Sequence, residues 1–449
     1  MTYETLAAAL RDALAQNDQA ALPALVAELN SADLADVIGQ AEDPEQAIVV
    51  LRTMTLEQRA DTFGYLPMSL QQAIAERLSP ADLAELVTAM SADERADLFN
   101  QLDDGIRYAL FKRLAREERE DLRRLASYEE GSAGAIMTSD YAMVQSGMSV
   151  ARALESLRRT APDKETIYQA FVVDEGHRLL GAVSLRQLIV AAPGVRVDDL
   201  MAREVVTAST DTPQEEVARL ISRYDLLALP IVNGGEKLVG IVTYDDAMDV
   251  AEAEATEDMH KGATVGKLET SLRDATPYAL YRSRVHWLVV LVFANIFTGA
   301  GIAYFEDTIS AHLALLFFMP LLVASAGNAG AQSATMMVRG LATGDVTTRD
   351  WARLLGKEIL VASALGLTMA AAVMLVGFFR AGADIALVVA LTMVVVVMVG
   401  SLIGMMLPFL LNRLQFDPAT ASTPLITTIA DVSGVLIYFG LATVLLGIV

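Results

Sequence analysis

Hydrophobic and polar positions divide the chain into three successive patterns, of which the first covers residues 1–130. Short segments there open with Ser, Thr or Asp and continue with apolar residues at helical spacing. These segments start roughly 12 residues apart, which predicts short helices stacked as a small superhelix. They are SADLADVI from 31, DPEQAIVV from 43, TLEQRADTF from 55, SLQQAIAERL from 69, SPADLAEL from 79 and SADERADLF from 91.

The second pattern, over residues 131–258, is one unit that occurs twice. Each copy has an apolar strand, a polar turn, a second strand and a helix, and a helical stretch precedes it. The copies are AFVVDEGHRLLGAVSLRQLI (170–189) after SVARALESLRRT (149–160), and LPIVNGGEKLVGIVTYDDAM (229–248) after TPQEEVARLISRY (212–224). A βαββα unit in tandem resembles the CBS domain pair.

The third pattern consists of long apolar runs, which lie near 287–305, 311–338, 358–379, 385–411 and 424–448. Each run is long enough to cross roughly 30 Å of hydrocarbon, so five transmembrane helices are predicted. The second run contains MPLLVASAGNAGAQSATMMV (319–338), which is rich in small and polar residues. Such a segment suits either close helix packing or a broken helix beside a water-filled path.

Charge separates the first two patterns from the third. The 449-residue chain has a net charge of −22, and nine basic and nine acidic residues cancel from Arg273 onward. The acidic excess therefore lies before the membrane runs, where it attracts cations and repels nucleic acid. Arg and Lys residues flank the runs on one side, so the acidic part is predicted to be cytoplasmic and the C-terminus to lie outside. The chain has no cysteine, which excludes disulfides and thiolate metal sites.

Asp431 is the candidate for chemistry within the membrane. It lies in the last apolar run, and no Lys or Arg follows Arg413. A lone carboxylate at membrane depth is costly and usually functional. The four histidines are scattered, and no Walker A loop is present, so a zinc enzyme and transport driven by the chain's own ATP hydrolysis are disfavoured.

Three segments carry a resemblance to a known family, and they are PLLVASAGNAGAQS, FDPATASTPLITTIADVSGVLIYFG and YDDAMDVAEAEATEDMHK. Together with the order of the parts, they resemble the MgtE family of magnesium channels. The resemblance implies a homodimer with one pore on the two-fold axis, in which two copies of Asp431 contact a hydrated Mg²⁺ ion. It also implies that the pore is lined by Gly327, Asn328, Thr335 and Thr427. Ala331 and Thr423 depart from the family pattern at positions where members can carry Asn.

The segment 244–258 is the second candidate site, because acidic residues crowd this one predicted helix with no base before Lys261. Like charges three or four positions apart destabilise a helix, so a bound cation is expected to relieve them. In the family this segment belongs to the plug helix. The resemblance implies three groups of Mg²⁺ ligands: Asp246 and Asp249 with Asp93 and Asp97; Glu254, Glu257, Asp258 and Asp417 near the membrane; and Glu215 with Asp225 between the CBS domains.

The CBS pair gives little support for ATP binding. Many CBS domains contact ribose through an Asp three residues after a Ser or Thr. The second repeat has Thr243 and Asp246, whereas the first has Ser184 and Gln187. Arg186 and Asp246 are the candidate nucleotide contacts.

The sequence therefore predicts a multidomain protein: an acidic helical superhelix (1–130), tandem α/β CBS domains (131–258), a plug or connecting helix (244–272) and five transmembrane helices (273–449). The predicted function is a Mg²⁺-selective channel of a bacterial-type inner membrane, closed by cytosolic Mg²⁺ and not an enzyme. Two alternatives stay open: a broader transporter that also carries Mn²⁺, Co²⁺ or Ni²⁺, and a CBS-regulated membrane sensor without flux. A membrane-bound enzyme under CBS control is disfavoured, since Asp431 is the one ionisable residue well within an apolar run.

Overall fold

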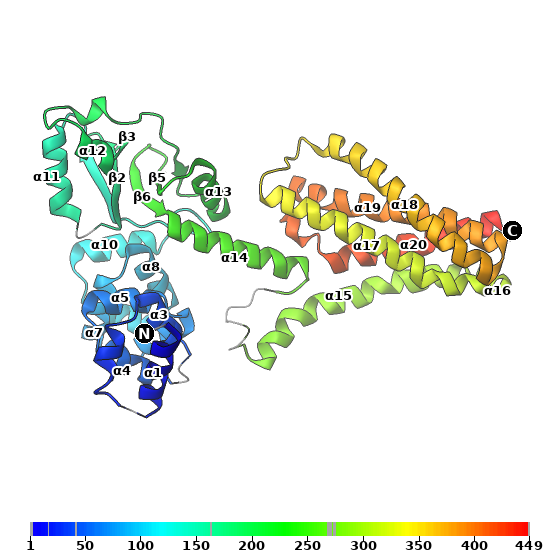
Figure 1. Ribbon diagram of the computed structural model, residues 1–449, viewed down its shortest axis with the longest axis horizontal. Coiled ribbons are helices and arrows are strands. Elements are labelled where there is room, and N and C mark those ends of the chain that lie inside the picture. The colour runs from blue at the N-terminus through cyan, green and yellow to red at the C-terminus, as the bar shows by residue number, and fades with distance from the viewer. Residues whose placement is uncertain are drawn as a thin grey trace. The chain divides into compact units, whose positions relative to one another are not determined.

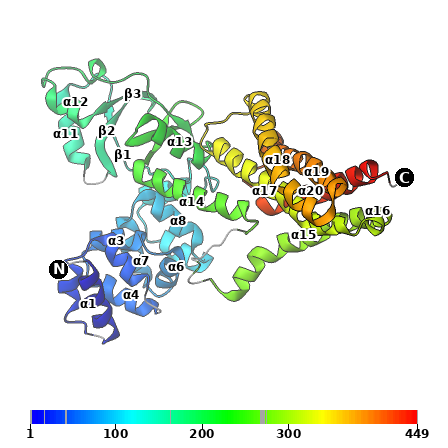
Figure 2. The same ribbon diagram turned by 45° about the vertical axis from the view of Figure 1, so that its right-hand side comes forward.

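The computed structural model describes residues 3–16, 18–40, 43–161, 164–266, 272 and 275–447. The chain divides into two compact units, Met1–Glu252 and Ala253–Val449. Figures 1 and 2 show the helical and CBS parts of the first unit and the long helices of the second. The predicted connecting segment runs past the end of α14, and its residues 267–271 lie outside the described part.

The first unit opens with a stack of short helices, as the recurring starts predict. Their bounds are α1 Tyr3–Ala15, α2 Leu22–Val26, α3 Ser31–Ile38, α4 Pro44–Leu51, α5 Leu56–Gly64, α6 Met68–Ala75, α7 Pro80–Ala89, α8 Ala92–Gln101, α9 Asp104–Phe111 and α10 Arg116–Leu125.

Caps and apolar faces explain where these helices begin and how they pack. Asp43, Thr55 and Ser79 each accept a hydrogen bond from a backbone N–H in the first turn of their helix. Two expected starts are shifted, because Asn30 and Pro67 take the N-cap positions of α3 and α6. The apolar faces meet in one core, whose fully buried members include Leu34, Phe63, Ile74 and Leu86.

The two repeats fold as the predicted βαββα units. The first consists of β1 Tyr141–Gln145, α11 Val150–Thr160, β2 Thr166–Val173, β3 Leu179–Ser184 and α12 Leu185–Val190. The second consists of β4 Ala208–Ser209, α13 Gln214–Tyr224, β5 Ala228–Val232, β6 Leu238–Thr243 and α14 Tyr244–Gly262. Each sheet has three strands, in the orders β1-β2-β3 and β4-β5-β6. In each sheet the first pair of strands is parallel and the second antiparallel.

Two equivalent glycines let a crossing segment approach each sheet. A Cβ atom at Gly181 would lie 2.7 Å from the Ala202 carbonyl oxygen, and one at Gly240 would lie 2.9 Å from that of Thr138. Thr138 also pairs with Ile241 as an isolated bridge. The two positions therefore need glycine because another backbone passes directly over them.

The second unit contains the five membrane helices, α15 Pro277–Tyr304, α17 Ala314–Ala342, α18 Trp351–Ala381, α19 Ala383–Arg413 and α20 Thr423–Leu445. The short helices α16 Glu306–Ala311 and η3 Pro418–Thr420 lie between them. These five helices are long and apolar enough to cross a membrane. Figure 1 shows them running side by side, with α19 packed against α17, α18 and α20.

The segment rich in small and polar residues forms a continuous helix, α17, which passes Pro320 without a break. Close packing accounts for its small residues. A Cβ atom at Gly404 would lie 2.0 Å from the Gly330 carbonyl oxygen, and one at Gly400 would lie 2.3 Å from that of Ala326. Of the two interpretations of this segment, close helix packing is therefore the one that the structure favours.

Candidate functional site

Asp431 lies in the middle of α20, on a helix whose start is firmly set. The Ser422 hydroxyl caps α20 by accepting from the Leu425 N–H, and Pro424 occupies its first turn. Asp431 is partly exposed at the surface of the unit. Among the described residues, no hydrogen bond or ion pair satisfies its carboxylate. A carboxylate at the centre of a membrane helix costs about 2.5–3.5 kcal/mol, and a bound cation or water would offset this cost.

The residues around Asp431 fall into packing and polar groups. Gly327 is buried, and a Cβ atom there would lie 3.2 Å from Cγ2 of Thr427. This glycine therefore lets α17 approach α20. The Thr427 hydroxyl donates to the Pro424 carbonyl (3.0 Å), and its oxygen lone pairs are left as acceptors.

One face of α17 presents polar side chains instead of apolar ones. Asn328, Gln332 and Thr335 are all exposed in the single chain, at helical spacing. Thr335 donates to the Ala331 carbonyl of its own helix (2.9 Å). The amides of Asn328 and Gln332 need hydrogen-bonding partners that lipid tails do not supply. This face is therefore suited to water or to a second copy of the chain.

A second carboxylate contacts a neighbouring membrane helix, and it was not predicted as a site residue. Glu358, near the start of α18, accepts a hydrogen bond from the Ser401 hydroxyl of α19. Its position at the edge of an apolar run, beside Lys357, made it look like a flanking charge. Glu358 is the first residue of its apolar run, so the prediction that Asp431 is the one ionisable residue well within these runs stays a prediction. The register between α18 and α19, which brings Ser401 beside Glu358, was the information that the sequence lacked.

The first unit brings Asp93 of α8 and Asp246 of α14 together. Burial and the carboxylate of Asp246 raise the pKa of Asp93 well above its usual range. Burial likewise raises the pKa of Asp246, although the Thr243 hydroxyl donates to its carboxylate and partly opposes this effect. The helical domain and the second CBS repeat thus meet through two carboxylates that repel each other.

Further acids surround this pair and form what we call the acidic cluster: Asp93, Glu94, Asp97, Glu130, Glu165, Asp245, Asp246 and Asp249. Burial and Glu130 raise the pKa of Asp97 to about 6, and burial and Asp246 raise that of Glu165 to about 7. Both side chains keep exposed surface, where water and salt screen part of the repulsion. Glu94, Glu130 and Glu165 were not predicted as site residues, because they lie far from the crowded segment 244–258 in the sequence.

The acidic cluster does not form a close ligand cage. Among the described residues, no three His, Asp or Glu side chains lie close enough together to hold a bare metal ion. Mg²⁺ usually keeps several of its waters and binds through one or two carboxylates. The cluster can therefore attract a hydrated Mg²⁺ ion without direct coordination by three side chains.

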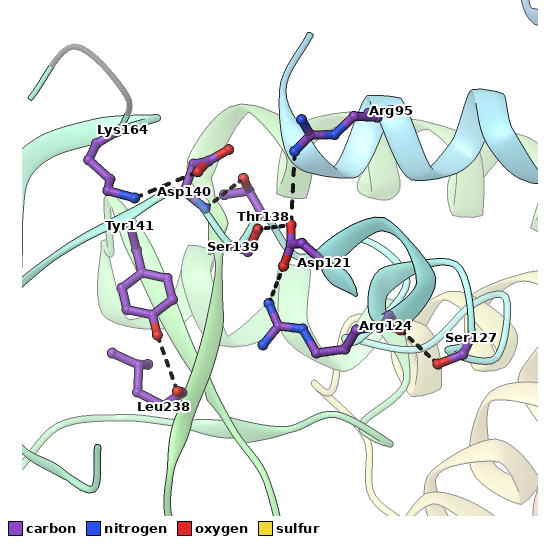
Figure 3. A network of polar contacts seen from close by, with 10 residues as sticks. All are labelled: Arg95, Asp121, Arg124, Ser127, Thr138, Ser139, Asp140, Tyr141, Lys164 and Leu238. Atoms are coloured by element: carbon purple, nitrogen blue, oxygen red, sulfur yellow. Dashed lines mark hydrogen bonds and ion pairs between the residues drawn. The ribbon is translucent and has the colours of Figure 1, made fainter. Parts of the chain in front are cut away.

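A separate network joins the helical domain to the CBS pair without a metal (Figure 3). The carboxylate of Asp121 on α10 lies 2.5 Å from Arg124 and 3.9 Å from the buried Arg95 of α8. It also accepts a hydrogen bond from the hydroxyl of Ser139, just before β1 (2.6 Å). This contact holds opposite charges and hydrogen bonds, so it does not depend on a divalent cation.

Glu215 and Asp225 lie at opposite ends of α13 within one chain. Glu215 is in its first turn, and Asp225 ends it with a left-handed backbone (φ 51°). Ten residues of helix separate them by about 15 Å, so one ion cannot bind both within a single chain. A shared site would need a second copy of the chain.

The predicted ligands near the membrane are partly drawn together in the second unit. Burial and the carboxylate of Asp417 raise the pKa of Asp258, while Lys261 opposes the shift. Nζ of Lys261 lies 2.5 Å from Glu257 and 2.5 Å from Asp417. Glu254 contributes a further repulsion on Asp258. An ammonium group therefore already lies among the carboxylates that were predicted to bind Mg²⁺ here.

Among the residues considered for nucleotide binding, Gln187 and Asp246 form hydrogen bonds with residues three positions away in the sequence. Ser184 and Gln187 cap each other at the start of α12, where the Gln187 N–H donates to the Ser184 hydroxyl (3.2 Å). Arg186 is exposed on the same helix. Asp246 accepts from Thr243 and belongs to the acidic cluster. In the first repeat, the position where many CBS domains carry a ribose-binding Asp is thus a capping glutamine.

Comparisons with protein families cover both units. A model described as a divalent cation transporter matches residues 319–441. A model of the MgtE intracellular N domain matches residues 11–131, and a CBS domain model matches residues 133–194 and 197–253.

Individual relatives agree with these matches. The magnesium transporter MgtE of Thermus thermophilus is 43% identical over 460 residues, covering 99% of this chain and 99% of the relative. That of Bacillus subtilis is 38% identical over 327 residues, covering 73% and 72%. A solved structure of the cytosolic domain of the Mg²⁺ channel MgtE in complex with ATP is 40% identical, with a TM-score of 0.52. It covers 54% of this chain and 99% of that one.

Proposed function

The chain belongs to the MgtE family of magnesium transporters, and from this premise we propose that it forms a homodimeric Mg²⁺ channel that cytosolic Mg²⁺ closes. One observation carries the proposal. Asp431 is a partly exposed carboxylate in the middle of a membrane helix, and it has no partner base among the described residues. Two such carboxylates, one from each subunit, would hold a hydrated dication through its water shell.

The polar face of α17 supports a pore between two subunits. Asn328 and Gln332 present amides that need water or protein partners. A two-fold arrangement of two subunits would supply water and protein partners along one shared path. The membrane potential, negative inside, would then drive entry with about 2.3 kcal/mol per charge for each 100 mV, and with about twice that for a dication.

The acidic cluster supports closure by cytosolic Mg²⁺. Its carboxylates raise the pKa of Asp93 and Glu165 through mutual repulsion as well as burial. At low Mg²⁺ this repulsion favours separation of the helical domain from the CBS pair. Bound Mg²⁺ would remove it and draw the two together. Several weak sites acting jointly give a steep response, because a ligand shifts an equilibrium only by its differential affinity for the two states.

ATP is a second ligand to test in the CBS pair. A related cytosolic domain was solved in complex with ATP. In this chain Gln187 takes the position of the ribose-binding acid in the first repeat, so we propose binding in the millimolar range at best, which corresponds to roughly −4 kcal/mol.

Ion flux into liposomes that contain the purified chain tests the proposed function. Mg²⁺ entry, followed with a trapped indicator dye, is expected in wild type and should be lost in Asp431→Ala. Mn²⁺, Co²⁺ and Ni²⁺ are measured in parallel, because carboxylate and water ligands discriminate weakly among divalent ions. Entry of all four ions at similar rates would make the chain a general divalent cation transporter. No entry of any ion would leave a sensor and overturn the proposal.

A further inference from the structure

Lys261 joins two segments of the second unit. Its ammonium lies 2.5 Å from Oε1 of Glu257, one turn earlier on α14, and 2.5 Å from Oδ2 of Asp417, which directly precedes η3. The three side chains are 34%, 35% and 40% exposed, so they are partly shielded from water. The pair with Glu257 stays within one helix. The pair with Asp417 connects α14 to the segment between α19 and α20.

Asp417 is itself held firmly in place. Its Oδ1 atom accepts from the Ala419 N–H (2.8 Å), which caps η3. η3 is followed by Ser422, whose hydroxyl caps α20, the helix that contains Asp431. The contact at Lys261 is therefore only a short, well-ordered stretch of backbone away from the start of the pore helix. Movement of Lys261 away from Asp417 would free the end of α14 from that stretch.

The charge balance around Lys261 explains why this contact forms. Four carboxylates, those of Glu254, Glu257, Asp258 and Asp417, belong to this region, and α14 has no other Lys or Arg. A lysine with its ordinary pKa is charged at neutral pH. The Lys261 ammonium lies against two of these carboxylates and supplies the positive charge that a metal ion would otherwise bring.

We propose that Lys261 is a built-in cation that holds the end of α14 against the α19–α20 connection when no divalent ion is bound. The inference rests on the proposed function, because it assigns this contact a part in gating. Lys261 is a positioning residue that does not contact the transported ion. Mg²⁺ entering this region competes with the ammonium for the Glu257 and Asp417 oxygens. Without the lysine, the same contact depends entirely on Mg²⁺.

A cross-linking experiment on the full chain measures the contact directly. The chain has no native cysteine, so the pair Met259→Cys and Phe416→Cys can be introduced on a clean background. Both native side chains are well exposed, at 76% and 63%, and each is within two residues of the ion pair. Reaction with a short bis-maleimide within one chain reports how close the two positions lie. A gel separates this product from cross-links between two chains.

In EDTA, Lys261→Met should slow cross-linking by about fivefold, the effect expected for loss of a partly exposed ion pair at the upper end of its usual range. Millimolar Mg²⁺ should restore the rate, because the ion replaces the ammonium. Lys261→Arg should retain it. Lys237→Met, at an exposed lysine of the CBS pair, is the matched control and should change nothing.

Asp417→Asn provides a second variant, since an amide oxygen can still cap η3 while the charge is lost. It should slow cross-linking as Lys261→Met does, and the double variant should add nothing further. Equal cross-linking rates for wild type and Lys261→Met in EDTA would overturn the inference. This readout needs no ion flux, so it separates failure of the contact from failure of the proposed channel function.

Discussion

Burial and the nearby carboxylate of Asp246 raise the pKa of Asp93, although the two residues belong to different domains of the first unit. Ionising both carboxylates therefore costs free energy while the helical domain contacts the second CBS repeat. The Asp121 network attaches the same two domains through opposite charges. A divalent cation would relieve the repulsion at the first contact, whereas the second already pairs opposite charges.

The stability of the first unit should depend on pH when divalent ions are absent. Raised pKa values mean that the folded state holds protons that the unfolded state has released. The associated stability is complete below the ordinary carboxyl pKa and is lost as pH rises through the folded values, about 6 for Asp97 and about 7 for Glu165. In EDTA, the unfolding temperature of the full chain should therefore fall between about pH 4 and pH 7 and level off above that.

Millimolar Mg²⁺ should reduce that fall, because the ion neutralises the carboxylates at high pH. Glu165→Gln should also flatten the pH dependence in EDTA. An unfolding temperature that falls equally with and without Mg²⁺ would show that the acidic cluster does not bind the ion.

Replacing Asp431 should stop ion movement without unfolding the chain. We expect Asp431→Ala to abolish Mg²⁺ uptake into liposomes, and Asp431→Asn to keep the shape of the site but lose its attraction for a dication. Ser433→Ala is a matched control on α20, because that hydroxyl donates only to carbonyls of its own helix, at 2.9 and 3.1 Å. If Asp431→Ala took up Mg²⁺ at the wild-type rate, Asp431 would not be a pore residue on which ion movement depends.

The close approach of α17 and α19 should be intolerant of a single methyl group. Gly404→Ala would place Cβ 2.0 Å from the Gly330 carbonyl oxygen, and forced overpacking of this kind costs about 1–3 kcal/mol. We expect a lower unfolding temperature for the variant in detergent. Gly356→Ala in α18, which meets nothing within 4 Å, should not lower it. Equal unfolding temperatures for the two variants would mean that the helices can separate freely at Gly404.

Binding of ATP should respond to the residue at position 187. Wild type is expected to bind in the millimolar range at best, and Gln187→Asp should bind more tightly, because it supplies the acid that many CBS repeats use for ribose. Titration calorimetry on the full chain measures both. Micromolar affinity in wild type would show that the glutamine is no obstacle.

The sequence was sufficient for the order and type of the elements, because their signals are local. Caps such as Asp43 and Thr55 predict helix starts, and the alternation of strands and helices predicts both CBS repeats. Asp431 was identifiable because a charge within an apolar run is conspicuous on its own. Such features need no knowledge of which segments meet in space.

Features that depend on long-range register were not predictable. Glu358 was missed because its partner Ser401 lies on another helix, and Glu165 was missed because it joins the acidic cluster only after folding. The contact between Lys261 and Asp417 was hidden for the same reason, since the two residues are distant in sequence. The small residues of α17 allowed two interpretations until Gly400 and Gly404 were found against them.

The acidic cluster can be tested separately from the acidity of the domain as a whole. Asp93→Asn, Asp246→Asn and Asp249→Asn together remove three charges from the cluster. Asp12→Asn, Asp36→Asn and Asp103→Asn together remove three charges from exposed positions of the helical domain, and they are the matched control. A general effect of net charge on the channel would appear equally in both triple variants.

Current through an excised membrane patch, with the cytosolic face exposed to the bath, is the most direct measurement of the central claim. When bath Mg²⁺ rises from nominally zero to millimolar, current in wild type and in the control triple variant should stop. Current in the Asp93, Asp246 and Asp249 triple variant should continue, while its dependence on Asp431 remains. Closure of that triple variant at the same Mg²⁺ concentration as wild type would contradict the claim that Mg²⁺ bound at the acidic cluster closes the pore.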